Sequence, residues 1–155
     1  MPLSSLQWQC LPFSSLDLAT LYVILRLRQE VFAVEQNSIY VDADGKDIDA
    51  LHLFATQDAQ IKAYCRLLPP GVKYPEASIG RVLSAPSARG KGVGKALMQK
   101  ALEQCATHFP QAAIRISAQL YLQDFYEALG FVAIAAPYDE DGIPHLEMLR
   151  RGVNR

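Results

Sequence analysis

The sequence predicts one mixed α/β domain with a central sheet and helices on its faces, and three observations support this prediction. The chain has 155 residues, the length of one ordinary domain, so we treat residues 1–155 as a single domain. Half of the residues are hydrophobic, which is enough for a buried core and excludes a disordered chain. Strand-like runs alternate with helical stripes in the order β-α-β-β-β-α-β-α-β-β, which is typical of a sheet flanked by helices.

The N-terminal half predicts a strand, a helix and a hairpin. Ser14 and Ser15 are expected to cap the helix, with Asp17 in its first turn, and apolar residues then recur with the helical period until about Phe32. The acid-rich segment 36–49 contains several turn-forming residues and predicts a polar loop. The strands predicted in this half cover residues 6–11, 52–56 and 61–67.

The C-terminal half contains the clearest predicted helix, residues 93–108. Its apolar side chains recur with the helical period, and Pro110 prevents the helix from continuing. A short helix at 122–129 is expected to end at Gly130, which can adopt the left-handed conformation of a helix terminus. The strands predicted in this half cover residues 78–84, 113–117, 131–135 and 146–149.

Charge and cysteine content exclude several classes of function. Fifteen basic and sixteen acidic residues nearly cancel, so the chain lacks the global positive field of a nucleic-acid-binding protein. We find no signal-peptide pattern and no apolar run near the roughly 20 residues that cross a bilayer, so no membrane partner is expected. Cys10, Cys65 and Cys105 are widely separated, which predicts reduced, buried thiols in a cytoplasmic protein and no metal site.

A glycine-rich loop at residues 89–95, spelled R-G-K-G-V-G-K, lies between the predicted strand 78–84 and the predicted helix 93–108. Glycine allows positive φ angles and lets the backbone approach a ligand closely. The first turn of a helix adds unpaired N–H groups and the positive end of the helix dipole. This combination predicts a binding site for the phosphate of a small molecule.

Two common phosphate-binding loops do not match this spelling. A P-loop, G-x-x-x-x-G-K-[ST], requires glycine at position 89 and a hydroxyl at position 96, where the chain has Arg89 and Ala96. A dinucleotide fingerprint, G-x-G-x-x-G, requires a third glycine at position 95, where the chain has Lys95. A nucleotide-binding protein is therefore the weaker hypothesis, and we expect no response to ATP or GTP.

Two motifs together resemble those of the GCN5-related N-acetyltransferase (GNAT) family. The loop spells R-x-x-G-x-G at residues 89–94, and a later segment spells F-Y-E-x-L-G-F at residues 125–131. Residues 28–36 and 141–145 further look like the ElaA-type subgroup of that family. The resemblance covers most of the chain. It implies a mixed, mostly antiparallel central sheet of six to seven strands flanked by about four helices, and transfer of an acetyl group from acetyl-CoA to an amine.

The resemblance also implies which residues hold acetyl-CoA. Backbone N–H groups of the glycine loop would bind the pyrophosphate, and the guanidinium of Arg89 would add charge-assisted contacts. The end of the preceding strand would pair with the pantetheine arm. Gln119 stands where many family members have an asparagine that contacts the cofactor. The expected cofactor-binding residues are Val82, Leu83, Ser84, Arg89, Gly90, Lys91, Gly92, Val93, Gly94, Lys95 and Gln119.

Catalysis requires an oxyanion donor, a general acid and a means of deprotonating the amine. By the resemblance, a backbone N–H of Leu83 or Ser84 would stabilise the oxyanion, and Tyr126 would protonate the leaving thiolate. Some family members carry a glutamate where this chain has Ile114, so the base is open. The candidates are Glu35, His52 and His145, although His52 could equally be a hydrogen-bonded core histidine and the reaction could use solvent without a dedicated base.

The leading hypothesis is an acetyl-CoA-dependent N-acetyltransferase acting on a primary amine of a small molecule or peptide. The alternative is a catalytically silent acyl-CoA-binding or sensing module, and Tyr126 favours the enzyme. The acidic segment 42–49 is expected either to attract a cationic amine or to be a solvated loop. Edge strands of such sheets often pair, so a homodimer is compatible with the sequence without being required by it.

Overall fold

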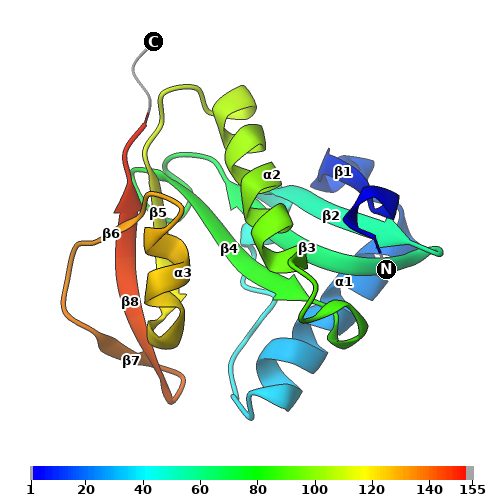
Figure 1. Cartoon of the computed structure of the whole chain (residues 1–155), viewed down its shortest axis with the longest axis horizontal. Helices are drawn as coiled ribbons and strands as arrows, with labels where there is room; N and C mark the ends of the chain where they lie inside the picture. Colours follow the sequence, from blue (N-terminus) through cyan, green and yellow to red (C-terminus); the bar gives the residue numbers. More distant parts are fainter. Residues whose placement is uncertain (1, 153–155) are drawn as a thin grey trace.

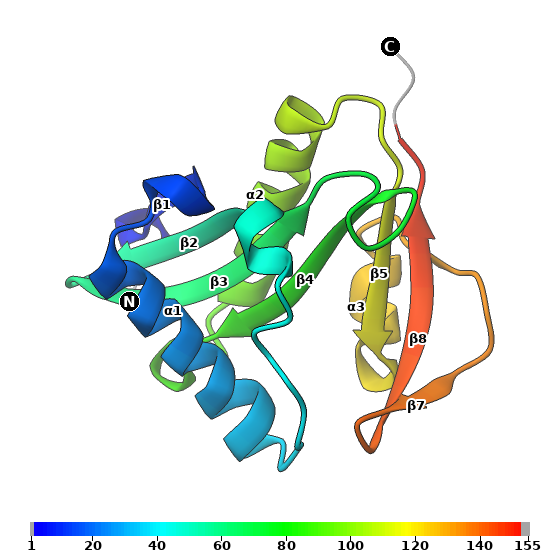
Figure 2. The same ribbon diagram turned by 180° about the vertical axis from the view of Figure 1, so that it is seen from behind.

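The computed structural model describes residues 2–152 and shows a central sheet with helices on both faces, as the sequence predicts. Helices α2 and α3 cover one face of the sheet, and α1 covers the other (Figure 1, Figure 2). The α-helices are α1 (Leu18–Arg28), α2 (Val93–His108) and α3 (Gln123–Glu127). The strands are β1 (Gln7–Pro12), β2 (Leu51–Gln57), β3 (Gln60–Leu68), β4 (Ala77–Ser84), β5 (Ile114–Gln119), β6 (Val132–Ala133), β7 (Tyr138–Glu140) and β8 (Ile143–Arg150).

The strands form one sheet in the order β1-β2-β3-β4-β5-β8-β6, with β7 paired to β8 beside this path. Within residues 2–152 the pair β4–β5 is parallel and the other strand pairs are antiparallel. The described residues thus contain eight strands and three α-helices, where six to seven strands and about four helices were expected. The additional strand is β7, which has only three residues and is too short to give a periodic pattern.

The parallel strands β4 and β5 separate after their first residues. They pair only at Ala77 with Ile114 and at Ser78 with Arg115, and they then diverge toward their C-terminal ends (Figure 2). The part of β4 beyond this point has no strand on its β5 side, so its backbone can pair with an extended ligand there. The separation therefore creates the space in which the candidate site lies.

Strand β4 contains a β-bulge before its C-terminal end. Its register against β3 shifts between the pairs Tyr64–Leu83 and Arg66–Gly80, so β4 carries an extra residue in this stretch. Arg81 lies in the bulge with φ +52, in the left-handed region that non-glycine residues seldom adopt. A bulge bends and twists its strand, and this one orients the last residues of β4 toward the opening.

Helix α2 has the bounds and the buried face that the sequence predicts. Leu97, Met98 and Ala101 are fully buried against the sheet. Burial of a large apolar side chain contributes about 1.5–3 kcal/mol, so this face anchors the helix and fixes the glycine loop at its N-terminus. On the opposite face of the sheet, α1 packs a smaller cluster around Ile24, Phe54 and other apolar residues.

The first helix differs from its prediction at both ends. Its N-cap is Asp17, whose carboxylate accepts a hydrogen bond from the backbone N–H of Thr20 at 2.7 Å, whereas Ser14 and Ser15 lie in a preceding 3-10 turn. The prediction of a serine cap was wrong because the turn places both serines before the helix. Beyond α1 the chain continues as a π-helical segment, Gln29–Glu35, and so passes the predicted end near Phe32.

The remaining differences concern the last strands. The predicted strand 131–135 pairs only over β6, and the predicted strand 146–149 begins earlier, at Ile143, because the β7–β8 hairpin extends it. Gly130 has φ +94 and adopts the left-handed conformation that was predicted for it. No helix within residues 2–152 is both long and apolar enough to cross a membrane.

The three cysteines are free thiols. Cys65 and Cys105 are buried and Cys10 is partly buried, so the prediction of buried thiols holds for two of the three. Burial raises the pKa of the Cys105 thiol to about 12, and it raises the pKa of Cys65 as well. Both side chains therefore stay protonated and are poor nucleophiles.

Candidate active site

A cavity of about 710 Å³ occupies the opening between β4 and β5. One wall is the end of β4 and the start of the glycine loop, and the facing wall is the end of β5 together with α3. The segment after α1 and the β7–β8 hairpin complete the lining of the cavity. Side chains from six separate segments thus meet at one place.

The glycine loop has the conformation of an anion-binding loop. Gly90 and Gly92 have φ +77 and φ +76, and Gly92 caps α2 with no side-chain hydrogen bond to the first turn. The first N–H groups of α2 therefore remain free to bind an anion. A Cβ on Gly94 would lie 3.8 Å from Ser84 Oγ, so the first turn of α2 packs closely against the end of β4.

Some of the predicted cofactor residues line the cavity wall, and the others lie on the glycine loop and the first turn of α2. Those on the cavity wall are Val82, Leu83, Ser84, Arg89, Gly94 and Gln119. Gly90, Lys91, Gly92 and Lys95 lie on the loop and first turn beside the cavity, and Lys91 Nζ lies 3.4 Å from the carbonyl oxygen of Ser87. The side chain of Val93 is buried in the core, so it can contribute only its backbone N–H.

Arg89 forms a two-pronged ion pair with Glu35. Its two terminal nitrogens donate to the two carboxylate oxygens at 2.6 and 3.0 Å, and both side chains are partly exposed at the cavity. The hydrogen bonds from Arg89 lower the pKa of Glu35. A lowered pKa makes a weaker base, so Glu35 is less suited to accept an amine proton than a free glutamate.

Tyr126 lies on the cavity wall with its ring held by two aromatic neighbours. The ring packs edge-on against Phe125 and Phe131, with centroids 5.1 and 5.9 Å away. Its hydroxyl makes no hydrogen bond to any residue that the structure describes, and desolvation raises its pKa. The phenol therefore stays protonated and has a proton to donate into the cavity. Tyr121 also borders the cavity, but its side chain is 76% exposed.

His52 lies in the core and not on the cavity wall. It is fully buried, with Nδ1 2.7 Å from the hydroxyl of Tyr64 and Nε2 2.9 Å from the carbonyl oxygen of Asp47. A carbonyl can only accept, so Nε2 donates and Nδ1 accepts from the tyrosine. Burial also lowers the pKa of His52. Both ring nitrogens are thus engaged, and His52 has no access to a substrate in the cavity.

His145 lies on the cavity wall in β8 and contacts Glu140 of β7. Its Nε2 is 3.1 Å from a carboxylate oxygen of Glu140, and its Nδ1 is 2.8 Å from the carbonyl oxygen of Ile143. Glu140 also borders the cavity and is missing from the sequence prediction. The Asp141-Gly142 pair, a strong signal for a two-residue hairpin turn, could have indicated that Glu140 and His145 lie on facing strands.

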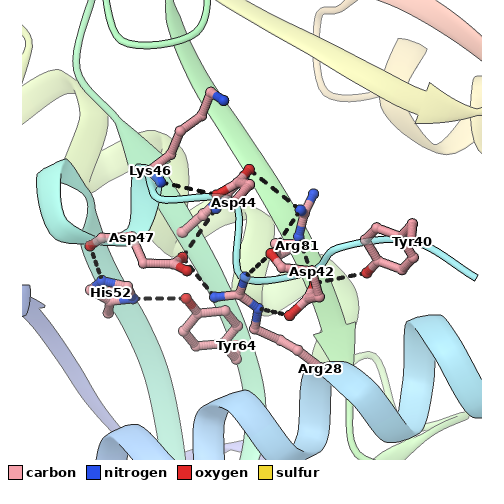
Figure 3. A network of polar contacts seen from close by, with 10 residues as sticks. Arg28, Tyr40, Asp42, Asp44, Lys46, Asp47, His52, Tyr64 and Arg81 are labelled. Carbon is pink, nitrogen blue, oxygen red and sulfur yellow. Dashed lines mark hydrogen bonds and ion pairs between the residues drawn. The ribbon is translucent and has the colours of Figure 1, made fainter.

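The acidic segment 42–49 forms an ion-pair network with three arginines that come from α1, β3 and β4 (Figure 3). Much of the network is buried, since Arg28 is 0% and Arg66 is 1% exposed, whereas Arg81 and Asp44 are partly exposed. The expectation of a solvated loop was therefore wrong for Asp42 and Asp47, which are buried. Attraction of a cationic amine by this segment stays a prediction. The pairs are Arg28 with Asp42 and Asp47, Arg66 with Asp44 and Asp47, and Arg81 with Asp42 and Asp44.

This network holds one side of the cavity in place. Tyr40 donates its hydroxyl to Asp42 at 2.7 Å, and the Arg81 guanidinium lies 5.5 Å from the centre of the Tyr40 ring (Figure 3). Asp44 also borders the cavity. Burial alone would raise the pKa of Asp44, but hydrogen bonds and charge from Arg66 and other partners lower it overall. The carboxylate is thus ionised and already neutralised by guanidinium groups.

Two further contacts join the segment after α1 to the far side of the cavity. The Gln119 side chain donates to Gln36 Oε1 at 3.1 Å, and the hydroxyl of Ser38 donates to the carbonyl oxygen of Asp141 at 3.2 Å. In this structure the amide of Gln119 is therefore engaged within the protein. Among residues 2–152 no group of three or more His, Cys, Asp or Glu side chains could hold a metal ion.

Comparisons with known proteins show which family and which solved structures the chain resembles. A family model described as an acetyltransferase (GNAT) domain matches residues 27–151. Protein ElaA of Escherichia coli is 41% identical over 147 residues, covering 94% of this chain and 96% of that protein. The crystal structure of an acyl-CoA N-acyltransferase from Pseudomonas aeruginosa is 44% identical, with a TM-score of 0.91, covering 94% of this chain and 99% of that chain. The crystal structure of Escherichia coli ElaA is 40% identical, with a TM-score of 0.89 and the same coverage.

Proposed function

The chain belongs to the GNAT acetyltransferase family, and we propose that it transfers an acetyl group from acetyl-CoA to a primary amine of a small molecule or peptide. The observation that carries the proposal is the cavity between β4 and β5. An unpaired strand edge, an anion-binding loop and a buried tyrosine converge there. For acyl transfer from a coenzyme A thioester, these three features would hold the pantetheine arm, bind the pyrophosphate and give a proton to the leaving thiolate.

The residues that line the cavity fit coenzyme A. Backbone N–H groups at the start of α2 would bind the pyrophosphate, and the β4 edge at Val82–Ser84 would pair with the pantetheine arm. Arg89 would add charge to the phosphate site. Because Glu35 holds Arg89 in a two-pronged pair, phosphate would have to compete with this carboxylate.

The proposed reaction is direct attack of a neutral amine on the thioester carbonyl. A backbone N–H of Leu83 or Ser84 would stabilise the oxyanion, a contribution of about 3 kcal/mol for a well-placed donor. Tyr126 would give its proton to the departing thiolate, since its raised pKa keeps the phenol protonated. The amine loses two protons in total: one before attack and one as the amide forms, which restores the tyrosine.

Of the three candidate bases for deprotonation of the amine, two border the cavity. His52 is fully buried and bonded at both nitrogens, so we do not include it. Glu35 and His145 both border the cavity. Glu35 is paired with an arginine that keeps it ionised and weakly basic. His145 is therefore the better candidate.

Thermal unfolding with acetyl-CoA tests the cofactor assignment. A ligand at 100 times its Kd stabilises the native state by about 2.7 kcal/mol, which raises the Tm of a domain this size by several degrees. Gly94→Glu would place a carboxylate at the phosphate site, whereas Gly94→Ala adds only a Cβ in ordinary contact with Ser84. We expect a shift for the wild type and Gly94→Ala and none for Gly94→Glu. No shift for the folded wild type at millimolar acetyl-CoA would contradict the proposal.

A further inference from the structure

We propose that Glu140 and His145 form the acceptor subsite, which holds one positive charge. In the free protein this charge is a proton, and in the substrate complex it is the ammonium group of a primary amine. Glu140 positions the charge, and His145 takes the proton before the amine attacks. This inference rests on the proposed function, because it names how the same cavity recognises and activates its acceptor.

The β7–β8 hairpin places the two side chains on one face. Its turn consists of Asp141 and Gly142, with φ +53 and φ +82, which fits the two-residue turn that the twist of paired strands favours. Tyr138 lies opposite His145, and Glu140 lies opposite Ile143. Because side chains alternate along a strand, Glu140 and His145 point to the same side, and both border the cavity.

The hydrogen bonds of His145 determine where its proton lies. Nδ1 is 2.8 Å from the carbonyl oxygen of Ile143, which can only accept, so Nδ1 carries a hydrogen. Nε2 is 3.1 Å from a carboxylate oxygen of Glu140. If the ring were neutral, its Nε2 lone pair would face the negative carboxylate. The contact is attractive only when one more positive charge lies there, as a proton on Nε2 or as a cation from outside.

Glu140 differs from the other paired carboxylates on the cavity wall. Glu35 is neutralised by Arg89, and Asp44 is neutralised by Arg66 and Arg81. An arginine stays protonated at any pH that the protein experiences, so these two carboxylates offer no net charge to a substrate. The partner of Glu140 is an imidazole, which can lose its proton. An incoming ammonium can therefore replace the proton at Glu140.

The other charged groups around the pair leave room for an ammonium group to replace the proton at Glu140. On the same face of the sheet, Glu147 is held by Arg115 at 2.5 Å, and the Tyr138 hydroxyl is hydrogen-bonded to Ser117. Lys73, from the loop before β4, also borders the cavity and is within electrostatic reach of Glu140. Glu140 remains 44% exposed and His145 10% exposed, so an amine in the cavity can reach both.

Binding of R–NH₃⁺ releases the proton of the pair to solvent, and the ammonium then donates to Nε2 of the neutral imidazole and to the carboxylate of Glu140. One N–H bond breaks as its proton moves to Nε2, which leaves R–NH₂ to attack the thioester. The positive charge stays beside Glu140 during attack. After transfer, His145 keeps this proton beside Glu140 and so returns to the state of the free protein. The one proton that left when the amine bound is therefore the only proton released to solvent, and the net reaction forms an amide and a thiol.

Steady-state kinetics with primary amines provide the first test. The variants are Glu140→Gln and His145→Gln, with Asp141→Asn as the matched control, because it removes a carboxylate next to Glu140 that has no contact with His145. At saturating acetyl-CoA, Glu140→Gln should raise the amine KM by roughly tenfold, equivalent to about 1.4 kcal/mol. The acetyl-CoA KM should stay unchanged. His145→Gln should mainly lower kcat, and Asp141→Asn should stay within about twofold of the wild type.

Nitrogen-15 NMR of the His145 ring provides a test without turnover. In the free wild type, the contact of Nε2 with Glu140 predicts a hydrogen on both ring nitrogens, and addition of propylammonium with coenzyme A should leave only the hydrogen on Nδ1. Glu140→Gln should show the neutral ring throughout, and Asp141→Asn should behave as the wild type.

The outcomes separate this inference from the proposed function. Equal amine KM values for Glu140→Gln and Asp141→Asn, in an enzyme that transfers acetyl groups, would overturn the subsite and leave the function intact. If the wild type acetylates no amine, the proposed function fails, and the NMR experiment alone decides whether the pair holds one exchangeable charge. A His145 ring whose charge state does not respond to propylammonium or to loss of Glu140 would overturn the subsite in either case.

Discussion

The two halves of the cavity are built in different ways. The half proposed for coenzyme A consists of backbone from two consecutive elements, the end of β4 and the start of α2. The half proposed for the acceptor consists of side chains from segments far apart in the chain, such as Asp44, Glu140 and His145. A backbone site depends on glycine spacing and can be recognised in a sequence, whereas a side-chain site exists only after the sheet has formed. The cofactor half should therefore tolerate side-chain changes that disrupt the acceptor half.

The largest effect should come from the network behind the acceptor half. Arg28→Ala removes a fully buried cation and leaves Asp42 and Asp47 without one of their partners. Breaking a buried pair in this way costs about 3–5 kcal/mol, because it leaves uncompensated charge. Urea unfolding measures this loss. The control is Arg26→Ala, which breaks the exposed pair with Glu30 and should cost less than about 1 kcal/mol. Equal losses would show that the network does not anchor the acceptor half.

Tyr126→Phe should come next and should affect chemistry more than folding. The hydroxyl makes no hydrogen bond to the described residues, so its removal leaves no partner unsatisfied and stability should change little. Loss of a general acid should lower kcat by about a hundredfold or more. Single-turnover measurement of CoA release checks this expectation, with Tyr121→Phe as the control. An unchanged rate of CoA release for Tyr126→Phe would show that the tyrosine is not the general acid. If the wild type itself transfers no acetyl group, a silent acyl-CoA-binding module is favoured instead.

Glu35→Gln probes the contact that joins the two halves. If Glu35 only competes for Arg89, the variant should bind acetyl-CoA a few-fold more tightly, because the guanidinium is released, and kcat should be unchanged. Isothermal titration at low and high salt measures this change, which salt should diminish. A fall in kcat of about a hundredfold with unchanged acetyl-CoA affinity would instead identify Glu35 as the base.

The smallest effect should be a dependence of stability on pH that arises from His52. Its pKa is lowered in the folded state by burial, so the unfolded chain binds a proton more readily than the folded one. The free energy of unfolding should therefore fall as pH drops from about 6.5 toward the lowered folded value. The aspartates of the network act at lower pH, since the pKa values of Asp44 and Asp47 are also lowered. Urea unfolding of the wild type and His52→Gln between pH 7.5 and pH 5 would separate the contribution of His52 from that of the aspartates. If the free energy of unfolding changed equally with pH in both proteins, the assignment to His52 would be contradicted.

The contrast between the halves also explains what the sequence could predict. Helix α2, the glycine loop and the motif around Tyr126 follow from local spacing, and the family comparisons confirm the resemblance drawn from them. The ion-pair network could not be foreseen, because Arg28, Arg66 and Arg81 meet the acidic segment only through tertiary packing. The acids in that segment suggested solvent because charged residues are seldom buried without partners, and the partners lay elsewhere in the chain.

His52 and Glu140 both show that the sequence alone does not tell which side chains reach the cavity. The sequence offered His52 as a base, but β3 provides Tyr64 and the segment before β2 provides the carbonyl of Asp47, so both nitrogens are satisfied in the core. Glu140 had no periodic pattern around it and was overlooked, although the hairpin places it beside His145. Which histidine is accessible depends on strand register, and register follows from the whole sheet and not from any single segment.

Hydrogen–deuterium exchange with and without acetyl-CoA tests most directly whether coenzyme A binds along the backbone of the opening between β4 and β5. We expect slower amide exchange in two segments together, the β4 end at 82–84 and the loop and first helical turn at 90–95. The hairpin at 138–145 should change only when an amine is also present. Protection confined to other parts of the chain, or protection at 90–95 without 82–84, would contradict the proposed binding mode.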